Sequence, residues 1–420
     1  TGGFGLGNPD MARLYLADGT TLVDSYSWVP HATTTYGRCP DGTGEWQTTT
    51  VPTRGAANDC SEPVDPITAS PWPGAAGSQP VDTQNTFGTD MSGVAYDADG
   101  TIWAVNNGNG TLHHLAIEGG VLTEIDQWTL RYPDGTGVVD AEGVALVGGS
   151  AQNGVLVASE RNTASGQSST SRPSILLYSV AGPGGVLPAA QEWNLQSFYP
   201  GIGANAGLEG VAWVSDEILV DAGLFDMNTG LAYQPTGYPA HNGGLVFVGV
   251  ESTNTVTGYV LAENGEMHAV TTLETVFPGV MELEFDAATG LLWVVCDEAC
   301  NGRMEVFEIG QAGSFVSLDV YDRPTGTQNI ANEGFAIGSA VAARDFRGVW
   351  GYFTAPPLGM VCAALVYTGV MGDGCVHSAK LNHPDGGACL FRCEIGDMRG
   401  VWRKRVNPSA PIGIEGEGGR

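Results

Sequence analysis

The sequence predicts an all-β protein, and three observations lead to that expectation. The 420 residues include 62 Gly and 23 Pro, with 42% hydrophobic and only 15% charged side chains, a composition typical of turn-rich folds with a large core. Residues 11–28 alternate apolar and polar side chains around Asp18-Gly19, which indicates a tight hairpin. A short Gly-Val-Ala motif recurs beyond residue 90. The length also favours more than one structural unit.

Residues 1–60 begin with this hairpin and continue with Thr-rich segments between Gly- and Pro-rich loops. The hairpin is accompanied by Trp28, the run from Tyr36 to Gly42 and the run from Pro52 to Asn58. Together these features resemble the C-terminal part of the lamin-tail domain of secreted bacterial proteins. The resemblance implies a partial, immunoglobulin-like β-sandwich.

Residues 61–84 separate this unit from the repeats. They are rich in Pro, Ser, Gly and Ala and lack apolar periodicity, so they predict a semi-rigid linker.

The recurring motif predicts a β-propeller over residues 85–337. Its copies begin 50, 67, 73 and 51 residues apart, at Ser92, Glu142, Glu209, Glu282 and Glu333. Repeats of this length with short strands are typical of propeller blades. We expect five or six blades with the Gly-Val-Ala strands innermost; the long intervals of 67 and 73 residues leave room for an extra blade or for insertions.

Several segments of this region carry a family resemblance. The segments SGVAYDADGTIWAVNN, SERN and PGVMELEFDAATGLLWVVCDEACNG, together with the EGVA motifs, are similar to secreted bacterial propellers described as phytase-like or esterase-like. The resemblance implies a hydrolase fold and a small-molecule ester or phosphoester substrate.

The repeated acids suggest a metal site. In a propeller, one position repeated in every blade forms a ring around the axis, so Glu142, Glu209, Glu282 and Glu333 are expected to converge. Oxygen ligands without His or Cys suit calcium. The alternative is that each Glu accepts backbone N–H groups from the adjacent blade.

A second set of polar residues follows the next strand of each repeat. It comprises Asn106, Glu160, Asp221 and Asp297, which are expected to form a ligand layer at the channel mouth or, alternatively, to initiate ordinary turns.

Catalytic residues are less clearly indicated. No G-x-S-x-G motif occurs, and the repeat region contains no Lys to bind a phosphate ester. The catalytic candidates are Glu160, Arg161, Glu209 and His241. Two function classes remain open: a metal-assisted ester or phosphoester hydrolase that uses the channel carboxylates, and a non-catalytic extracellular binding or scaffold propeller with structural calcium.

Charge and cysteine content limit the partners and the location. The net charge of -29 argues against nucleic acid, because phosphate neutralisation needs Lys and Arg. Eight cysteines favour an oxidising compartment, so we expect a secreted, extracellular protein whose signal peptide is not present in this fragment. We further expect disulfides between Cys39 and Cys60 and between Cys296 and Cys300, a monomeric state and no membrane span.

Residues 338–420 break the repeat pattern. Four cysteines and a cluster of basic residues appear there, and the Gly-Val-Ala motif stops. We expect an atypical tail, frame-shifted or otherwise foreign in origin, that does not complete the propeller; a divergent last blade is the alternative.

Overall fold

The computed structural model describes residues 10–29, 35–49, 53, 55–60, 67–73, 78–82, 86–87, 90–118, 121–166, 170–327, 329, 333–338, 348–355 and 360–368. The chain divides into two compact units, Thr1–Thr68 and Ala69–Arg420. Strands dominate both units, as predicted for an all-β protein.

The first unit contains two hairpins. One pairs β1 (Asp10–Tyr15) with β2 (Leu22–Trp28), and the other pairs β3 (Thr35–Cys39) with β4 (Glu45–Thr49). An ion pair of 2.6 Å between Arg38 and Asp24 connects the hairpins. A disulfide joins Cys39 to Cys60, whose Cα atoms are 5.6 Å apart. Because the described strands form separate two-stranded sheets, the β-sandwich stays a prediction.

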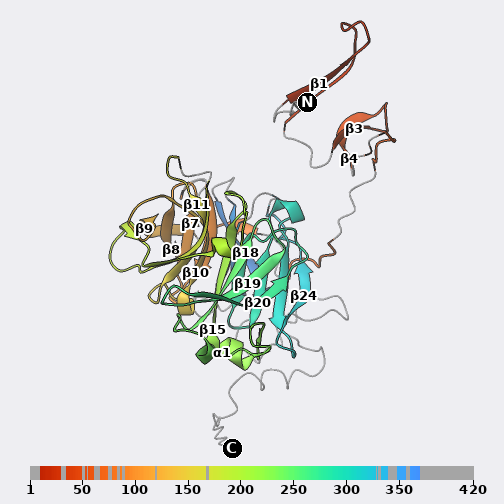
Figure 1. The fold of residues 1–420 in the computed structure, drawn as a ribbon. Coiled ribbons are helices and arrows are strands. Elements are labelled where there is room, and N and C mark those ends of the chain that lie inside the picture. Colours follow the sequence, from red (N-terminus) through yellow and green to blue (C-terminus); the bar gives the residue numbers. More distant parts are fainter. Residues whose placement is uncertain are drawn as a thin grey trace, which may run out of the picture. The chain divides into compact units, whose positions relative to one another are not determined.

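The second unit contains larger antiparallel sheets that follow one another in chain order (Figure 1). The β6 sheet consists of β6 (Met91–Tyr96), β7 (Ile102–Asn106), β8 (Thr111–Glu118), β9 (Val121–Arg131) and the added β13 (Gly185–Pro188). The β10 sheet consists of β10 (Val139–Leu146), β11 (Val155–Asn162), β12 (Ser171–Tyr178) and β14 (Gln191–Asn194). The β15 sheet consists of β15 (Leu208–Ser215), β18 (Gly244–Val250), β19 (Thr255–Leu261) and β20 (Met267–Glu274).

Two further sheets complete the described part of this unit. The β21 sheet consists of β21 (Glu282–Asp286), β22 (Leu291–Val295), β23 (Met304–Ile309) and β24 (Phe315–Tyr321). The β25 sheet consists of β25 (Gly334–Gly338), β26 (Gly348–Ala355), β27 (Met360–Thr368) and β5 (Ser78–Pro80).

The arrangement of these sheets is propeller-like. Strands β6, β10, β15, β21 and β25 each lie at one end of their sheet and contact one another in a closed cycle. The strands that carry the repeated motif are therefore innermost, as predicted. Among the described residues, four of these sheets have the four strands typical of a blade, which is fewer four-stranded blades than the five or six expected, and the β6 sheet carries a fifth strand, β13.

Glycine explains why the motif recurs. A Cβ on Gly93 would lie 2.5 Å from the carbonyl oxygen of Glu142, and one on Gly210 would lie 2.7 Å from the carbonyl carbon of Glu282. A Cβ on Gly143 would collide with the carbonyl oxygen of Glu209. At these three positions the inner strand approaches the next so closely that only glycine fits.

Insertions, rather than an extra blade, fill the long intervals. After Glu142 the chain adds β13, which pairs in parallel with β9 of the preceding sheet. After Glu209 it adds α1 (Asp216–Asp221), β16 (Phe225–Asp226), β17 (Leu231–Ala232) and a 3-10 turn at Pro235–Gly237. The segment EILVDAG contains Asp221, which was expected at the end of a strand, but the segment is largely helical. The Ser215 side chain caps α1 by accepting the Ile218 N–H at 3.3 Å.

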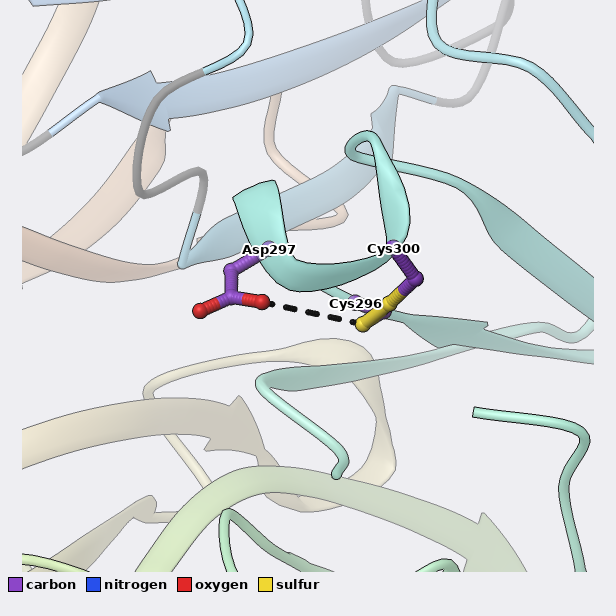
Figure 2. Close-up of side chains that lie close together, drawn as sticks. All are labelled: Cys296, Asp297 and Cys300. Atoms are coloured by element: carbon purple, nitrogen blue, oxygen red, sulfur yellow. Dashed lines mark hydrogen bonds between the residues drawn. A yellow bond between two sulfur atoms is a disulfide. The ribbon is translucent and has the colours of Figure 1, made fainter. Parts of the chain in front are cut away.

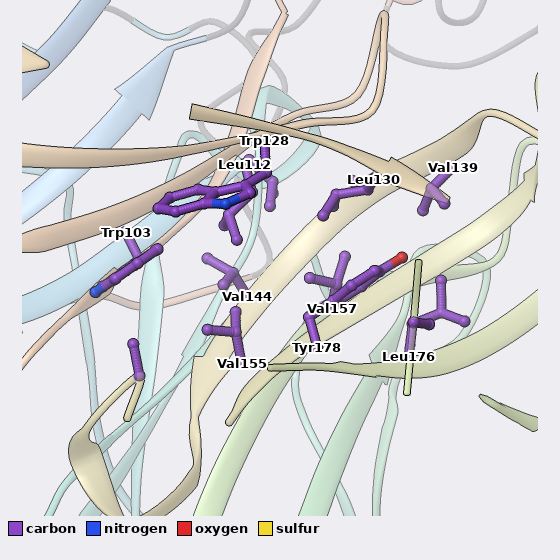
Figure 3. Packing of buried hydrophobic residues seen from close by; sticks show 14 of the residues in the cluster. Trp103, Leu112, Trp128, Leu130, Val139, Val144, Val155, Val157, Leu176 and Tyr178 are labelled. Carbon is purple, nitrogen blue, oxygen red and sulfur yellow. The ribbon is translucent and has the colours of Figure 1, made fainter. Parts of the chain in front are cut away.

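The apolar residues of neighbouring sheets meet between the sheets. One cluster joins the β6 and β10 sheets and includes Trp103, Trp128, Val144 and Tyr178 (Figure 3). The turn before Trp103 is tied to this cluster by Asp97, whose carboxylate accepts the Trp103 indole N–H at 3.1 Å.

Part of the predicted linker belongs to the second unit. Its described residues, 69–73 and 78–82, form a strap along the outer edges of the sheets. In this strap, Ser70 donates its N–H to Val320 at 2.8 Å, Trp72 packs 6.1 Å from Trp293, and β5 pairs with β27. The carbonyl of Val81 then accepts the N–H of Leu122 in β9 at 2.5 Å. The strap thus reaches the β21, β25 and β6 sheets.

The region after residue 338 corrects another expectation. Strand β26 pairs with β25 and with β27, and β27 pairs with β5, so residues 348–355 and 360–368 do continue the sheet pattern. Strand pairing tolerates this composition because its hydrogen bonds come from the backbone. Residues 369–420 lie outside the described part of the chain. Within the described part, no helix has the length and hydropathy required to cross a membrane.

Candidate functional site

The inner strands and the strands next to them bring five carboxylates together, which we call the carboxylate site. The ligand oxygens of Asp140, Glu142 and Glu160 all lie within 4.8 Å of one another, and so do those of Glu160, Glu209 and Glu251. Glu160 belongs to both groups and connects them. The sequence predicted Glu142, Glu160 and Glu209 here but not Asp140 or Glu251.

Burial and mutual repulsion make these acids weak. Burial raises the pKa of Asp140 to about 6 and that of Glu160 to about 7. The pKa values of Glu142 and Glu209 are well above their usual range, first through burial and then through the charges of neighbouring acids. Because several ionised carboxylates repel one another in this buried site, a bound cation would stabilise their charged forms.

Glu251 has a carboxylate oxygen that lacks the hydrogen bond needed to compensate its burial. Its Oε2 is buried and accepts no hydrogen bond from the described part of the chain, and it lies beside Glu209, which is 7% exposed. Asn107, by contrast, donates to both oxygens of Glu142 at 3.2 and 3.1 Å. A buried carboxylate oxygen without a donor is stabilised by a proton or a cation.

Arg161 is the basic group beside the site. Its Nε lies 2.6 Å from Oδ2 of Asp140, and its Nη1 donates to the carbonyl of Ala204 at 2.8 Å. The side chain is 21% exposed, so it also faces solvent. Arg161 partly offsets the effect of burial on the pKa of Asp140.

Glu282 behaves differently from the other repeated acids. It is fully buried, and its Oε1 accepts backbone N–H groups from Leu283 at 2.8 Å and from Val211 of the adjacent sheet at 3.3 Å. This is the structural alternative to metal ligation. Glu333 lies just before β25, where burial raises its pKa to about 7. The repeated position therefore does not form one uniform ring of ligands.

The strand-end layer is only partly as predicted. Glu160 is part of the carboxylate site. Asp221 is instead exposed at the end of α1, because the residues before Asp221 form a helix. The equivalent strand end of the β15 sheet is Glu251, which directly follows β18. The apolar run GLVFVGV before Glu251 marks this strand end in the sequence, but the apolar run EILV before Asp221 predicts a strand as well. Asn106 is buried at the end of β7.

Asp297 lies in a loop held by a disulfide between Cys296 and Cys300, whose Cα atoms are 6.0 Å apart (Figure 2). Its Oδ1 caps the 3-10 turn Glu298–Cys300 by accepting the Ala299 N–H at 2.9 Å. The three side chains are close together, but sulfurs bonded to each other are not metal ligands. The charge of Asp297 nevertheless contributes to the raised pKa of Glu251.

His241 lies away from the carboxylate site. Its Nε2 is 3.1 Å from Oδ2 of Asp216, the first residue of α1, and its Nδ1 contacts the carbonyl of Pro239 at 2.8 Å. Asp216 follows the C-terminal end of β15, whereas Glu209 lies near the beginning of that strand. The strand rises about 3.3 Å per residue, which puts His241 roughly 20 Å from Glu209 along it.

The amino-acid sequence from 86 to 226 matches a family model. That family is phytase-like, described as the esterase-like activity of phytase. The match includes Asp140, Glu142, Glu160 and Glu209 of the carboxylate site. No curated protein matches the chain.

Solved structures with some likeness to the chain include a nidogen/laminin complex, at 14% identity, a TM-score of 0.32, and 64% of this chain and 78% of that chain covered. A mitotic checkpoint complex has 10% identity, a TM-score of 0.35, and 73% of this chain and 99% of that chain covered. Virginiamycin B lyase from Staphylococcus aureus has 12% identity, a TM-score of 0.31, and 66% of each chain covered. Likeness at this level says nothing about activity.

Proposed function

We propose that the carboxylate site binds a divalent cation, calcium in the first place, and that the protein uses it to hydrolyse an ester or phosphoester of a small molecule. The observation that carries this proposal is Oε2 of Glu251, a buried carboxylate oxygen that accepts no hydrogen bond from the described residues and belongs to the group whose ligand oxygens lie within 4.8 Å of one another, with Glu160 and Glu209. The phytase-like match supports an ester as the substrate.

The residues fit a hard cation. All the ligand candidates are carboxylates, and Ca²⁺ prefers six to eight oxygen ligands. Asp140, Glu142, Glu160, Glu209 and Glu251 would hold the ion. When bound, calcium would supply a positive charge that polarises an ester or phosphoryl oxygen.

Arg161 would orient the substrate. The guanidinium has five N–H donors, of which Asp140 and the Ala204 carbonyl use only part. The remaining donors suit an anionic oxygen, and fixed pairing with Asp140 limits the rotamers of the side chain. We place this activity in a secreted monomer whose first unit is the end of a lamin-tail domain.

The second candidate function is a non-catalytic extracellular binding or scaffold propeller with structural calcium. Glu142 and Glu209 are only 5% and 7% exposed, so an ion between them would be nearly enclosed by protein. A structural ion has such an environment, because it needs no open coordination position for a substrate.

Calorimetric titration with calcium and magnesium, followed by assays on phosphoester and acyl-ester panels with and without a chelator, tests both functions. Glu209→Gln should weaken calcium binding about tenfold or more. Glu274→Gln, an exposed acid at the end of β20, is the matched control and should bind as the wild type does.

The outcomes separate the two functions. Calcium-dependent hydrolysis that Glu209→Gln lowers supports the hydrolase. Calcium binding with a higher melting temperature but no turnover on either panel supports the structural ion. An absence of calcium binding contradicts both.

A further inference from the structure

Gly207 connects two ligands of the carboxylate site through one residue of backbone. Its N–H donates to Oε1 of Glu160, and its carbonyl accepts the N–H of Glu251 at 3.0 Å. Glu160 lies in β11 and Glu251 directly follows β18, and these strands belong to neighbouring sheets. The spacing of these two acids therefore depends on where Gly207 lies.

The segment around Gly207 is fixed at further points. Ser252 donates its hydroxyl to the carbonyl of Ala206 at 2.8 Å, and Arg161 donates to that of Ala204 at 2.8 Å. Glu209 comes two residues later at the beginning of β15. The same short segment thus contacts or carries all three members of the Glu160, Glu209 and Glu251 group.

The space at Gly207 is closely filled by Glu160. A Cβ added to Gly207 would lie 3.2 Å from Cβ, Cγ and Oε1 of Glu160, so that side chain would have to move. A Cβ added to Gly203, in the same segment, would meet only the Cβ of Ala206 at 3.7 Å, an ordinary contact. The two glycines form a matched pair for substitution.

We infer that Gly207 is a positioning residue that sets the distance between Glu160 and Glu251 for a cation. This inference rests on the proposed function, and in particular on Glu251, whose buried Oε2 accepts no hydrogen bond from the described part of the chain. Gly207 does not touch the ion itself. It acts through the carboxylate that it holds, as outer hydrogen bonds do at other metal sites.

Calorimetric titration of the full chain with calcium compares Gly207→Ala with Gly203→Ala. Gly207→Ala should lower the affinity about tenfold, and Gly203→Ala should leave it unchanged. In a Glu160→Gln background, Gly207→Ala should have little further effect on the affinity, because Gly207 acts on the ion only through the Glu160 carboxylate, which this variant lacks. Equal and additive losses in both backgrounds would show that Gly207 acts on the fold alone.

Hydrogen exchange of the wild type covers the case in which Gly207→Ala does not fold. Calcium should slow exchange of the Gly207 amide by several fold, because a ligated Glu160 keeps its hydrogen bond to that amide. If the wild type binds calcium but Gly207 exchange is unchanged, the inference is wrong and the cation site stands. If the wild type binds no calcium, the proposed function fails and the inference fails with it.

Discussion

The guanidinium Nε of Arg161 lies 2.6 Å from Oδ2 of the buried Asp140. Arg161→Met removes this charge while keeping an unbranched side chain. The pKa of Asp140 should then rise further above its value of about 6, since burial would act without opposition. NMR titration of the Asp140 carboxyl carbon measures the change. Arg161→Lys should retain most of the wild-type pKa, and equal values in all three proteins would contradict the proposed pairing.

Without a cation, the protein should lose stability as the pH rises. Asp140, Glu160 and Glu333 have folded-state pKa values of about 6, 7 and 7, above the usual values of 3.8 for Asp and 4.5 for Glu. The native state then holds more protons than the unfolded state between about pH 4 and 7, so the free energy of unfolding falls across this window. In chelator, the melting temperature should drop by about 5 °C or more from pH 5 to pH 8.

Excess calcium should reverse this trend, because the ion replaces the protons at the carboxylates. Calorimetric melting curves at both pH values provide the test. A melting temperature that is the same at pH 5 and pH 8 in chelator would count against the raised pKa values.

The pairing of His241 with Asp216 should stabilise the α1 insertion at low pH. The hydrogen bond to Asp216 raises the pKa of His241, and both side chains are largely buried. A raised histidine pKa adds stability that is complete below about pH 6.5 and disappears as the pH rises through the folded value. His241→Gln should cost about 1–3 kcal/mol at pH 5.5 and clearly less at pH 9, as urea unfolding can show. A loss that is equal at both pH values would indicate packing instead of charge.

Gly143 should tolerate no side chain. A Cβ there would collide with the backbone carbonyl of Glu209, which belongs to the neighbouring inner strand and cannot rotate away. Gly143→Ala should cost more than about 4 kcal/mol or prevent folding. Gly237→Ala, at a position with nothing within 4 Å of the added carbon, should stay within about 0.5 kcal/mol of the wild type. Denaturant unfolding compares them, and similar values for the two would refute the close approach of the inner strands.

The sequence was most informative where one physical requirement repeats. Gly93, Gly143 and Gly210 recur because each inner strand approaches the next, so the repeat alone located the inner strands. The sequence predicts Glu160 as a site residue because it closely follows the apolar run VLVA of its strand, β11. Asp140 was missed although it lies two residues before Glu142, on the same face of β10.

Other features depended on contacts that local patterns do not encode. The run EILV is apolar enough for a strand, but the Ser215 cap favours a helix there. The strand-end position of the β15 sheet is therefore occupied by Glu251 and not by the predicted Asp221. Glu282 shares its position with Glu142 and Glu209 but faces the backbone N–H of Val211 instead of other carboxylates. The strap was read as a linker because its strand is short and its partner, β27, lies at the far end of the described chain.

The strap also determines the order of assembly on the ribosome. β5 emerges early in synthesis, but its partner β27 ends at Thr368, so the nascent chain carries β5 unpaired while all the intervening strands are made. Trp72 likewise waits for Trp293. An unpaired strand and an uncovered indole expose the growing chain to aggregation. Ring closure therefore comes late, and a chain that stops before residue 360 has no strand with which to pair β5.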